Sequence, residues 1–240
     1  MRFPTWRPIW WRPRVQCLLC GGPAEHADLP LCTGCDDDLP WLAGHCSICA
    51  LPLPATGLTC AQCLRRSPSF QRVETPLRYG FPVDALVTRF KHQSDAPSGR
   101  LLGQLLERHL LHAFGEGLVR PDRLIPVPLS RRRERHRGFN QAALLAGWLS
   151  GPLGVPVDNR LVQRPQDTPA QQGLDAATRK RNLRNAFALA DGANLEGLHL
   201  ALVDDVLTTG ATAERIARLL RRAGARRVDV YCLARTPAPE

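Results

Sequence analysis

The chain has 240 residues, a hydrophobic fraction of 44% and a formal net charge of +10. This length suits one domain of about 150 residues with a smaller one beside it. The positive charge favours polyanions, namely phosphorylated metabolites, nucleic acid or an anionic membrane surface, and says nothing about fold. No apolar run approaches the roughly 18 residues that span a bilayer, so we expect no transmembrane segment.

The chain opens with MRFPTWRPIWWRPRVQ, which is basic and aromatic and is interrupted by prolines. It lacks the continuous apolar core of a signal peptide. We therefore expect a cytoplasmic protein. Two interpretations of this arm stay open. Its tryptophans and arginines could stack on bases or lie at a membrane interface, or the arm could be irregular and pack on the body of the protein.

Residues 1–66 contain eight of the nine cysteines and little aliphatic sequence. Zinc takes four soft ligands in a tetrahedron, and each Cys-x-x-Cys knuckle offers two sulfurs from one tight turn. A small segment with so little core needs such a support. We expect a zinc-ribbon-like module with structural zinc, as one or two ions, paired sequentially or interleaved. The predicted ligands are Cys17, Cys20, Cys32, Cys35, Cys46, Cys49, Cys60 and Cys63.

Two histidines lie between these pairs and offer an alternative ligand. His26 and His45 could each replace one cysteine, although a solvent-facing position is the simpler interpretation. Cys232 stands alone in an apolar run and is expected to be a packed, inert side chain. Because metal binding would provide the folding energy of the module, we expect strong chelation to unfold residues 1–66.

The rest of the chain alternates between strand and helix patterns. Apolar residues recur at helical spacing in 83–90, and 101–114 reads as an amphipathic helix. Such an alternation predicts an α/β fold with an open, mostly parallel sheet. Further expected strands are 123–129, 155–164, 198–203 and 228–234, the expected helices are 139–150 and 212–224 with Gly224 at the end of the latter, and 235–240 is expected to fray.

The stretch ALVDDVLTTGAT, residues 201–212, joins an expected buried strand to an expected helix. Asp204 and Asp205 follow the strand, and vicinal ribose hydroxyls can donate hydrogen bonds to such a pair. The TTGAT run opens the helix, where unpaired N–H groups and the helix dipole favour phosphate. These features predict a ribose 5-phosphate site at the carboxyl edge of the sheet. The alternative is an ordinary helix N-cap.

Residues 131–137, RRRERHR, form a predicted basic loop after the PVPLS turn. Arginine binds phosphate in a bidentate manner, so the loop could hold a diphosphate or follow a nucleic-acid backbone. A solvated charge run is the alternative. Basic residues also gather at 179–184 and, around a helix end, at 221–227. The predicted nucleic-acid or phosphate contacts are Arg131, Arg132, Arg133, Arg135 and Arg137.

LVDDVLTTGAT closely resembles the phosphoribosyl diphosphate (PRPP) binding motif of type I phosphoribosyltransferases. DRLIPVPLSRRRERHRGFNQA, TPAQQGLDAATRKRNLRNAF, RFKHQSD and the leading Cys-x-x-Cys pairs further resemble the ComF family of competence proteins. The likeness covers nearly the whole chain after residue 16. It implies a type I phosphoribosyltransferase-like domain at 67–240, with a cap and lead-in helices at 67–120 and a core at 121–236, after a zinc-binding module at 1–66.

The resemblance also implies roles for particular residues. The two aspartates would bind the ribose hydroxyls, residues 208–212 the 5-phosphate and residues 127–131 the diphosphate, and 164–186 would match the mobile catalytic loop. Residues 70–100 would select an acceptor, with Lys91 and Arg100 as polar contacts. Asp204, Asp205 and Arg179 are the catalytic candidates. The PRPP-binding candidates are Asp204, Asp205, Val206, Thr208, Thr209, Gly210, Ala211, Thr212, Val127, Pro128, Leu129, Ser130, Arg131 and Lys91.

Three functions are consistent with these patterns. The first is a role in DNA uptake and natural transformation, with single-stranded DNA and DNA-uptake or recombination proteins as partners. The second is an active phosphoribosyltransferase that uses magnesium-bound PRPP and an unknown acceptor. The third is a regulator that senses PRPP without turnover. Phosphoribosyl transfer requires positioning and charge stabilisation more than a catalytic triad, so the lack of a triad signature does not exclude the second.

Overall fold

The computed structural model describes residues 15–25, 28–93, 95–164 and 186–238. It divides into two compact units, 1–39 and 40–240. The second pair of Cys-x-x-Cys knuckles therefore lies in the unit that carries the sheet, whereas the domain boundary predicted from sequence is at residue 66. The arm up to residue 14 and the segment 165–185 lie outside the described residues. No helix in the described part of the chain has the length and apolar character needed to cross a membrane.

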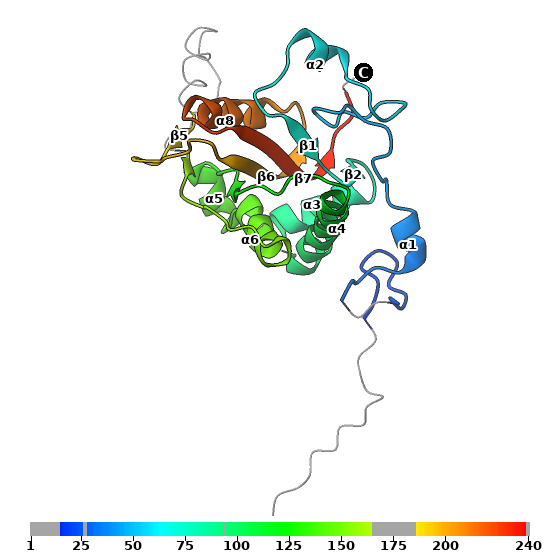
Figure 1. Cartoon of the computed structure of the whole chain (residues 1–240). Helices are drawn as coiled ribbons and strands as arrows, with labels where there is room; N and C mark the ends of the chain where they lie inside the picture. Colours follow the sequence, from blue (N-terminus) through cyan, green and yellow to red (C-terminus); the bar gives the residue numbers. More distant parts are fainter. Residues whose placement is uncertain (1–14, 26–27, 94, 165–185, 239–240) are drawn as a thin grey trace, which may run out of the picture. The chain divides into compact units, whose positions relative to one another are not determined.

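A parallel sheet forms the centre of the second unit (Figure 1). The strand order is β1-β7-β6-β3, and β2 pairs with β7 beyond the end of β1. A separate antiparallel pair is formed by β4 and β5. The expectation of an open, mostly parallel sheet is confirmed. The strands are β1 (Arg72–Glu74), β2 (Leu77–Arg78), β3 (Arg123–Pro126), β4 (Val162–Gln163), β5 (Ala188–Leu189), β6 (His199–Leu207) and β7 (Arg227–Arg235).

The two central strands are longer than their apolar runs indicated. β6 continues through both aspartates, because it pairs in register with β7 as far as Leu207 opposite Arg235. The expectation of a frayed tail from residue 235 is therefore wrong at its first residue, since Arg235 ends β7 and is 5% exposed. The strand expected at 123–129 ends at Pro126. Of the residues expected as a strand at 155–164, only Val162–Gln163 form one.

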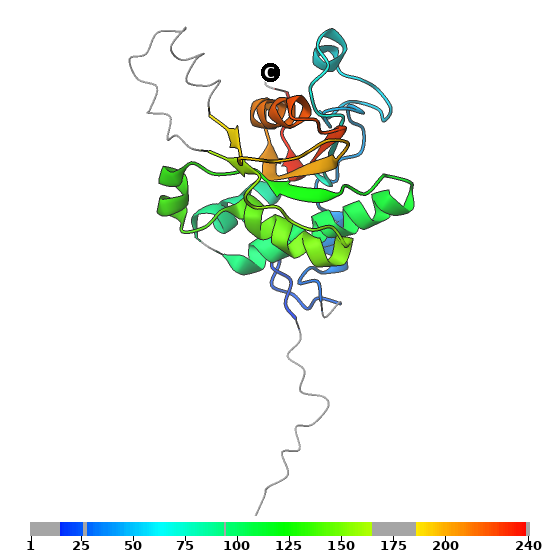
Figure 2. The ribbon, with the colours of Figure 1, turned by 60° about the vertical axis from the view of Figure 1, so that its left-hand side comes forward.

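Helices cover both faces of the sheet (Figure 2). α3, α4 and α6 lie on one face and α8 on the other. α6 begins where the side chain of Asn140 accepts hydrogen bonds from two backbone N–H groups. Residues 131–137, expected as a loop, form α5, which Ser130 caps. The helices are α1 (Thr33–Asp37), α2 (Ala61–Arg65), α3 (Val83–His92), α4 (Ala96–Gly115), α5 (Arg131–Arg137), α6 (Gln141–Leu153) and α8 (Ala211–Arg222).

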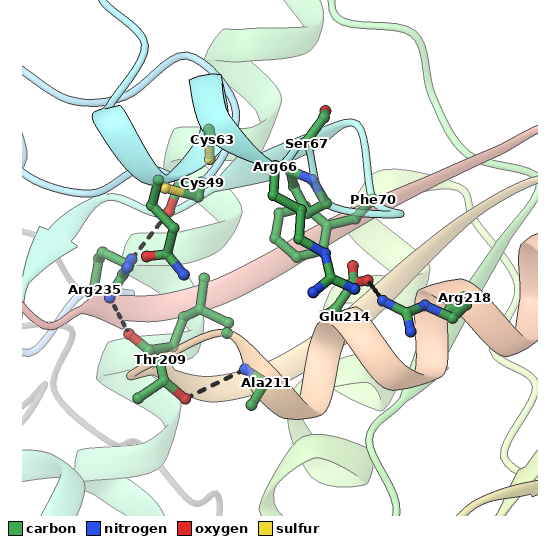
Figure 3. Close-up of a pocket in the computed structure, with 14 residues that line it drawn as sticks. Cys49, Cys63, Arg66, Ser67, Phe70, Thr209, Ala211, Glu214, Arg218 and Arg235 are labelled. Atoms are coloured by element: carbon green, nitrogen blue, oxygen red, sulfur yellow. Dashed lines mark hydrogen bonds and ion pairs between the residues drawn. The ribbon is translucent and has the colours of Figure 1, made fainter. Parts of the chain in front are cut away.

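Residues 40–70 are connected to the rest of the second unit by hydrogen bonds near both ends of the segment. The backbone N–H of Leu42 donates to the Pro76 carbonyl at 2.8 Å, and Trp41 forms an antiparallel bridge with Leu77 in β2. At the other end of the segment, the Ser69 N–H donates to the Glu214 carboxylate of α8 at 2.6 Å. Figure 3 shows how the segment that follows Cys63 faces the first turns of α8. The segment with the second pair of Cys-x-x-Cys knuckles is thus attached next to β2 at its start and to α8 at its end.

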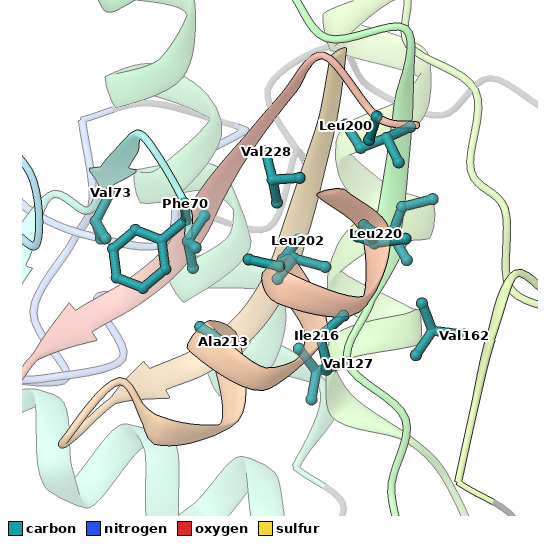
Figure 4. Packing of buried hydrophobic residues seen from close by; sticks show 14 of the residues in the cluster. Phe70, Val73, Val127, Val162, Leu200, Leu202, Ala213, Ile216, Leu220 and Val228 are labelled. Carbon is teal, nitrogen blue, oxygen red and sulfur yellow. The ribbon is translucent and has the colours of Figure 1, made fainter. Parts of the chain in front are cut away.

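The core under α8 follows from the amphipathic pattern of that helix. Ala213, Ile216, Ala217 and Leu220 are spaced at i, i+3, i+4 and i+7 and are all buried. They meet the alternating inward residues of β6 and β7, as Figure 4 shows. Fully burying one such Leu or Ile contributes roughly 1.5–3 kcal/mol. This packing fixes the first turn of α8, and with it the loop that precedes the helix.

Candidate functional site

The acidic pair lies in the last part of β6, at the carboxyl edge of the sheet. Asp204 is opposite Cys232 of β7. Lys91, from the end of α3, places Nζ 2.9 Å from Oδ2 of Asp205. The side chains also accept local backbone hydrogen bonds, from Asp205 N to Asp204 Oδ1 at 2.9 Å and from Val206 N to Asp205 Oδ1 at 2.6 Å. The structure therefore brings Lys91 and both predicted aspartates together.

The two carboxyl groups differ in their electrostatic environment. Burial first, and then the neighbouring charge of Asp205, raise the pKa of Asp204 to about 7. Its hydrogen bond from the Asp205 N–H and the charge of Lys91 partly oppose this rise. Asp205 has a cation in direct contact. Near neutral pH this edge therefore holds one carboxylate paired with a lysine and one carboxyl that is divided between its two protonation states.

The loop after β6, predicted from sequence to bind phosphate, leads directly into the first turn of α8. Gly210 has a φ of 73°, a left-handed conformation that favours glycine, and it is the N-cap residue of the twelve-residue helix α8. Thr209 Oγ1 accepts from the Ala211 N–H at 3.3 Å. Thr208, Thr209, Ala211 and Thr212 are all exposed. The hydroxyls and the first N–H groups of α8 therefore face solvent next to the acidic pair.

The turn predicted to bind diphosphate lies at the same edge. Val127 N–H donates to the Val203 carbonyl at 2.9 Å, immediately before Asp204. Asn140 Nδ2 donates to the Val127 carbonyl at 3.1 Å, which ties the turn to the start of α6. Pro128 and Leu129 are partly exposed and Ser130 is buried. α5 follows directly, and all its arginines except the partly exposed Arg137 are exposed.

Two further predicted residues take different positions. The Arg100 guanidinium lies 4.5 Å from the centre of the Trp148 ring, a cation–π contact between α4 and α6 rather than an open polar group. Arg179 lies outside the described residues, as does nearly all of the loop predicted at 164–186. Arg235, whose Nη1 donates to the Leu207 carbonyl at the end of β6 at 3.0 Å, was not predicted from sequence, because nothing in its local pattern distinguishes it from a solvent-exposed tail residue.

The eight predicted cysteine ligands form two groups in sequential order. Within each group the sulfur atoms all lie within 4.8 Å of one another. Cys20 Sγ is 3.7 Å from Cys32 Sγ, and Cys49 Sγ is 3.7 Å from Cys60 Sγ. Tetrahedral Zn–S bonds of about 2.3 Å place sulfurs about 3.8 Å apart. The residues therefore fit a structural Zn²⁺ in each group. The first group is Cys17, Cys20, Cys32 and Cys35, and the second is Cys46, Cys49, Cys60 and Cys63.

The surroundings of these sulfurs also suit metal binding. Burial raises the thiol pKa of Cys46, but backbone N–H donors oppose it and bring the pKa down to about 7. The same balance lowers the pKa of Cys17 to about 6. Each group thus has one thiol that ionises readily, and thiolate is the form that metal binds. His45 Nδ1 donates to the Ala43 carbonyl at 2.9 Å, and His45 is not in the second group. His26 lies outside the described residues.

Comparison with known proteins identifies the family. The chain is 37% identical over 222 residues to competence protein F of Haemophilus influenzae, covering 92% of this chain and 96% of that protein. It is 39% identical over 221 residues to DNA utilization protein YhgH of Escherichia coli K12, with the same coverage. The chain belongs to the ComF family. Competence protein ComFC of Bacillus subtilis is a more distant ComF relative, 29% identical over 251 residues, with 93% of this chain and 96% of that protein covered.

The family model described as "Phosphoribosyl transferase domain" matches residues 140–240 of this ComF protein, a range that contains β6, the acidic pair and α8. Adenine phosphoribosyltransferase from Saccharomyces cerevisiae superposes on this chain with a TM-score of 0.40 and 19% identity, and the match covers 60% of this chain and 72% of that enzyme's chain. The fold assignment rests on the family model and the parallel sheet, and it confirms the predicted phosphoribosyltransferase-like fold.

Proposed function

We propose that this ComF protein acts in DNA uptake, and that it binds single-stranded DNA and a phosphoribosyl ligand such as PRPP at the carboxyl edge of its sheet. The proposal rests on one observation, which is that three features lie at that edge. They are the acidic pair of β6, the exposed hydroxyl and glycine loop before α8, and the exposed arginines of α5. Likeness to a competence protein over 92% of the chain supports the cellular role.

The chemistry of each feature matches one part of the ligand. Asp204 and Asp205 supply acceptors for two ribose hydroxyls. The loop at 208–212 supplies hydroxyls and helix N–H groups for a phosphate. The turn at 127–131 would hold the diphosphate, whose charge is neutralised by Mg²⁺, a cation that keeps several waters and is held largely by phosphate oxygens. The pairing of Lys91 with Asp205 limits carboxylate repulsion before the ligand binds.

The nucleic-acid part of the proposal rests on α5. Four of its arginines are exposed, and Arg137 is held by a hydrogen bond from Nη1 to Oε1 of Gln141 at 3.0 Å. A short helix that exposes guanidinium groups can follow a phosphate backbone without reading bases. Neutralising phosphates releases counterions, so binding of this kind weakens steeply with salt.

Isothermal titration calorimetry tests the phosphoribosyl site. Magnesium-bound PRPP should bind the wild type, and binding should be lost in Asp204→Ala/Asp205→Ala. If the wild type does not bind PRPP, the phosphoribosyl part of the proposal fails. An assay for diphosphate release with a panel of nucleobases then separates an active transferase from a PRPP sensor, because a sensor would bind without turnover.

Single-stranded DNA binding is measured as a function of salt. The logarithm of the affinity should fall by about 0.7 for each phosphate neutralised, for each tenfold rise in salt. Arg131→Ala/Arg133→Ala should weaken binding and flatten this slope. Arg222→Ala/Arg226→Ala removes the same charge from exposed positions at and just beyond the C-terminal end of α8, away from α5, and should change the slope little. Equal effects of the two double variants would assign binding to net charge rather than to α5.

A further inference from the structure

Arg235 joins the second cysteine group to the loop before α8. Its side chain is buried, with the residue 5% exposed. Nε donates to the backbone carbonyl of Cys49 at 2.9 Å. Nη1 donates to the Leu207 carbonyl at 3.0 Å and also contacts the Thr208 carbonyl. One guanidinium therefore connects a metal-binding knuckle with the two residues that lead into the loop, as Figure 3 shows in part.

A second contact reaches the same loop from its other side. Ser69, which follows the second cysteine group, donates through N–H and Oγ to the Glu214 carboxylate, at 2.6 and 3.1 Å. Glu214 lies in the first turns of α8 and is also paired with Arg218. The loop between Leu207 and Glu214 is thus attached to the 46–70 segment at both of its ends.

A cavity of about 360 Å³ separates the two parts. Its walls include Cys49 and Cys63 on one side and Thr209 and Gly210 on the other, with Arg235 between them. Beside the cavity, Ala50 and Phe70 pack in the same core as Leu207 and Ala213. Within the cavity wall, Arg235 adds a directional link, because its hydrogen bonds join the Cys49 carbonyl to the loop. Arginine suits this role, since its planar group has five donors in fixed directions.

We propose that Arg235 is a positioning residue, through which metal bound at the second cysteine group fixes the loop at 207–211. Metal bound by Cys46 and Cys49 would hold the knuckle closed and so keep the Cys49 carbonyl in place for Arg235. Release of the metal frees that carbonyl and loosens the loop. The phosphoribosyl consequence of this link rests on the proposed function, whereas the link itself does not.

Hydrogen–deuterium exchange of the full-length, metal-loaded protein tests the link. Cys60→Ser removes one ligand of the second group, and exchange in peptides covering 207–211 should accelerate on the order of tenfold, as for loss of one hydrogen bond to a charged group. Cys35→Ser makes the same change in the first group, which lies in the other compact unit, and should leave that exchange unchanged. Exchange in α4 serves as the folding control.

Coupling between two sites is reciprocal, which gives a second test. Arg235→Lys keeps the charge but replaces donors on two separate nitrogens, Nε and Nη1, by one ammonium group, so we expect it to weaken the link between the Cys49 and Leu207 carbonyls. In a Cys35→Ser background, where only the second group is complete, it should speed zinc transfer to a chromophoric chelator and accelerate exchange at 207–211. Faster loop exchange with an unchanged rate of zinc release would overturn the proposal.

Further outcomes distinguish the proposed link through Arg235 from the proposed function. If Cys60→Ser does not fold, stepwise zinc removal from the wild type with a mild chelator replaces it, and loop exchange that does not follow zinc content of the second group refutes the link. If the wild type binds no PRPP, the proposed function fails while the exchange result still stands. If it does bind PRPP, Arg235→Lys should weaken that binding, and PRPP should slow zinc release.

Discussion

Replacing Asp204 by Asn should stabilise the protein at alkaline pH. The Asp204 carboxyl has a pKa of about 7 in the folded state against an ordinary value of 3.8, chiefly because of burial and the charge of Asp205. The folded state therefore binds the proton more tightly than the unfolded state does. Between these two values, wild-type stability falls as the pH rises. A rise of about three units in the Asp204 pKa corresponds to a loss of at most about 4 kcal/mol of wild-type stability at alkaline pH. Because water has access to this partly exposed side chain, we expect an effect of about 1–3 kcal/mol.

The substitution is well matched, since the amide keeps the Oδ1 that accepts the Asp205 N–H at 2.9 Å. Urea unfolding followed by circular dichroism at pH 5 and pH 8 measures the effect. Asp204→Asn should exceed the wild type by more at pH 8 than at pH 5, because at pH 5 most of the wild type's loss of stability has not yet occurred. Asp191→Asn, which removes an exposed carboxyl, controls for net charge. A difference that is equal at both pH values, or that grows toward acid, would refute the reasoning.

Three other effects follow from the structure. Gly210→Ala should cost about 1 kcal/mol of unfolding free energy, because it strains a left-handed residue without a clash, whereas Gly224→Ala, where a Cβ would lie 2.6 Å from the Glu196 carboxylate at a φ of 102°, should cost more; urea titrations that rank them the other way would contradict this. Asp229→Ala should destabilise the fold by about 1–3 kcal/mol, because it leaves the buried His199 without its 2.8 Å hydrogen-bond partner, and a loss well below about 1 kcal/mol would be inconsistent with that pairing. Dialysis at pH 4 should strip metal that is retained at pH 7, because binding requires thiolates; atomic absorption showing equal content at both would exclude cysteine coordination.

The sequence predicted well what short motifs encode. The acidic pair, the glycine before α8 and the cysteine knuckles each depend on residues close together in the chain, so their local structure could be inferred from spacing. The length of β6 was underestimated, because Asp204 and Asp205 interrupt its apolar run, and pairing with β7 carries the strand past them to Leu207. Lys91 was assigned to the site by family resemblance, and its Nζ lies 2.9 Å from Asp205 Oδ2; its role in ligand binding stays a prediction.

What the sequence did not reveal depends on tertiary contacts. β1 and β2 are only three and two residues long, and they exist as strands because β7 offers a partner along its whole length. The seven residues of α5 are almost all charged and carry no apolar stripe, so no periodicity marked them as a helix. The role of Arg235 depends on carbonyls of Cys49 and Leu207, which are 186 and 28 residues away in sequence.

The placement of β7 at the centre of the sheet has a consequence for how the chain folds during synthesis. β7 pairs with β1 and β6, yet it follows them in sequence, and Gln71 and Val228, which hydrogen-bond at one end of β1, are 157 residues apart. Contacts of such long range slow folding, because the loop must close before they form. Until then β1 and β6 each expose an unpaired edge, so the nascent sheet is open to misassociation until its last strand is made.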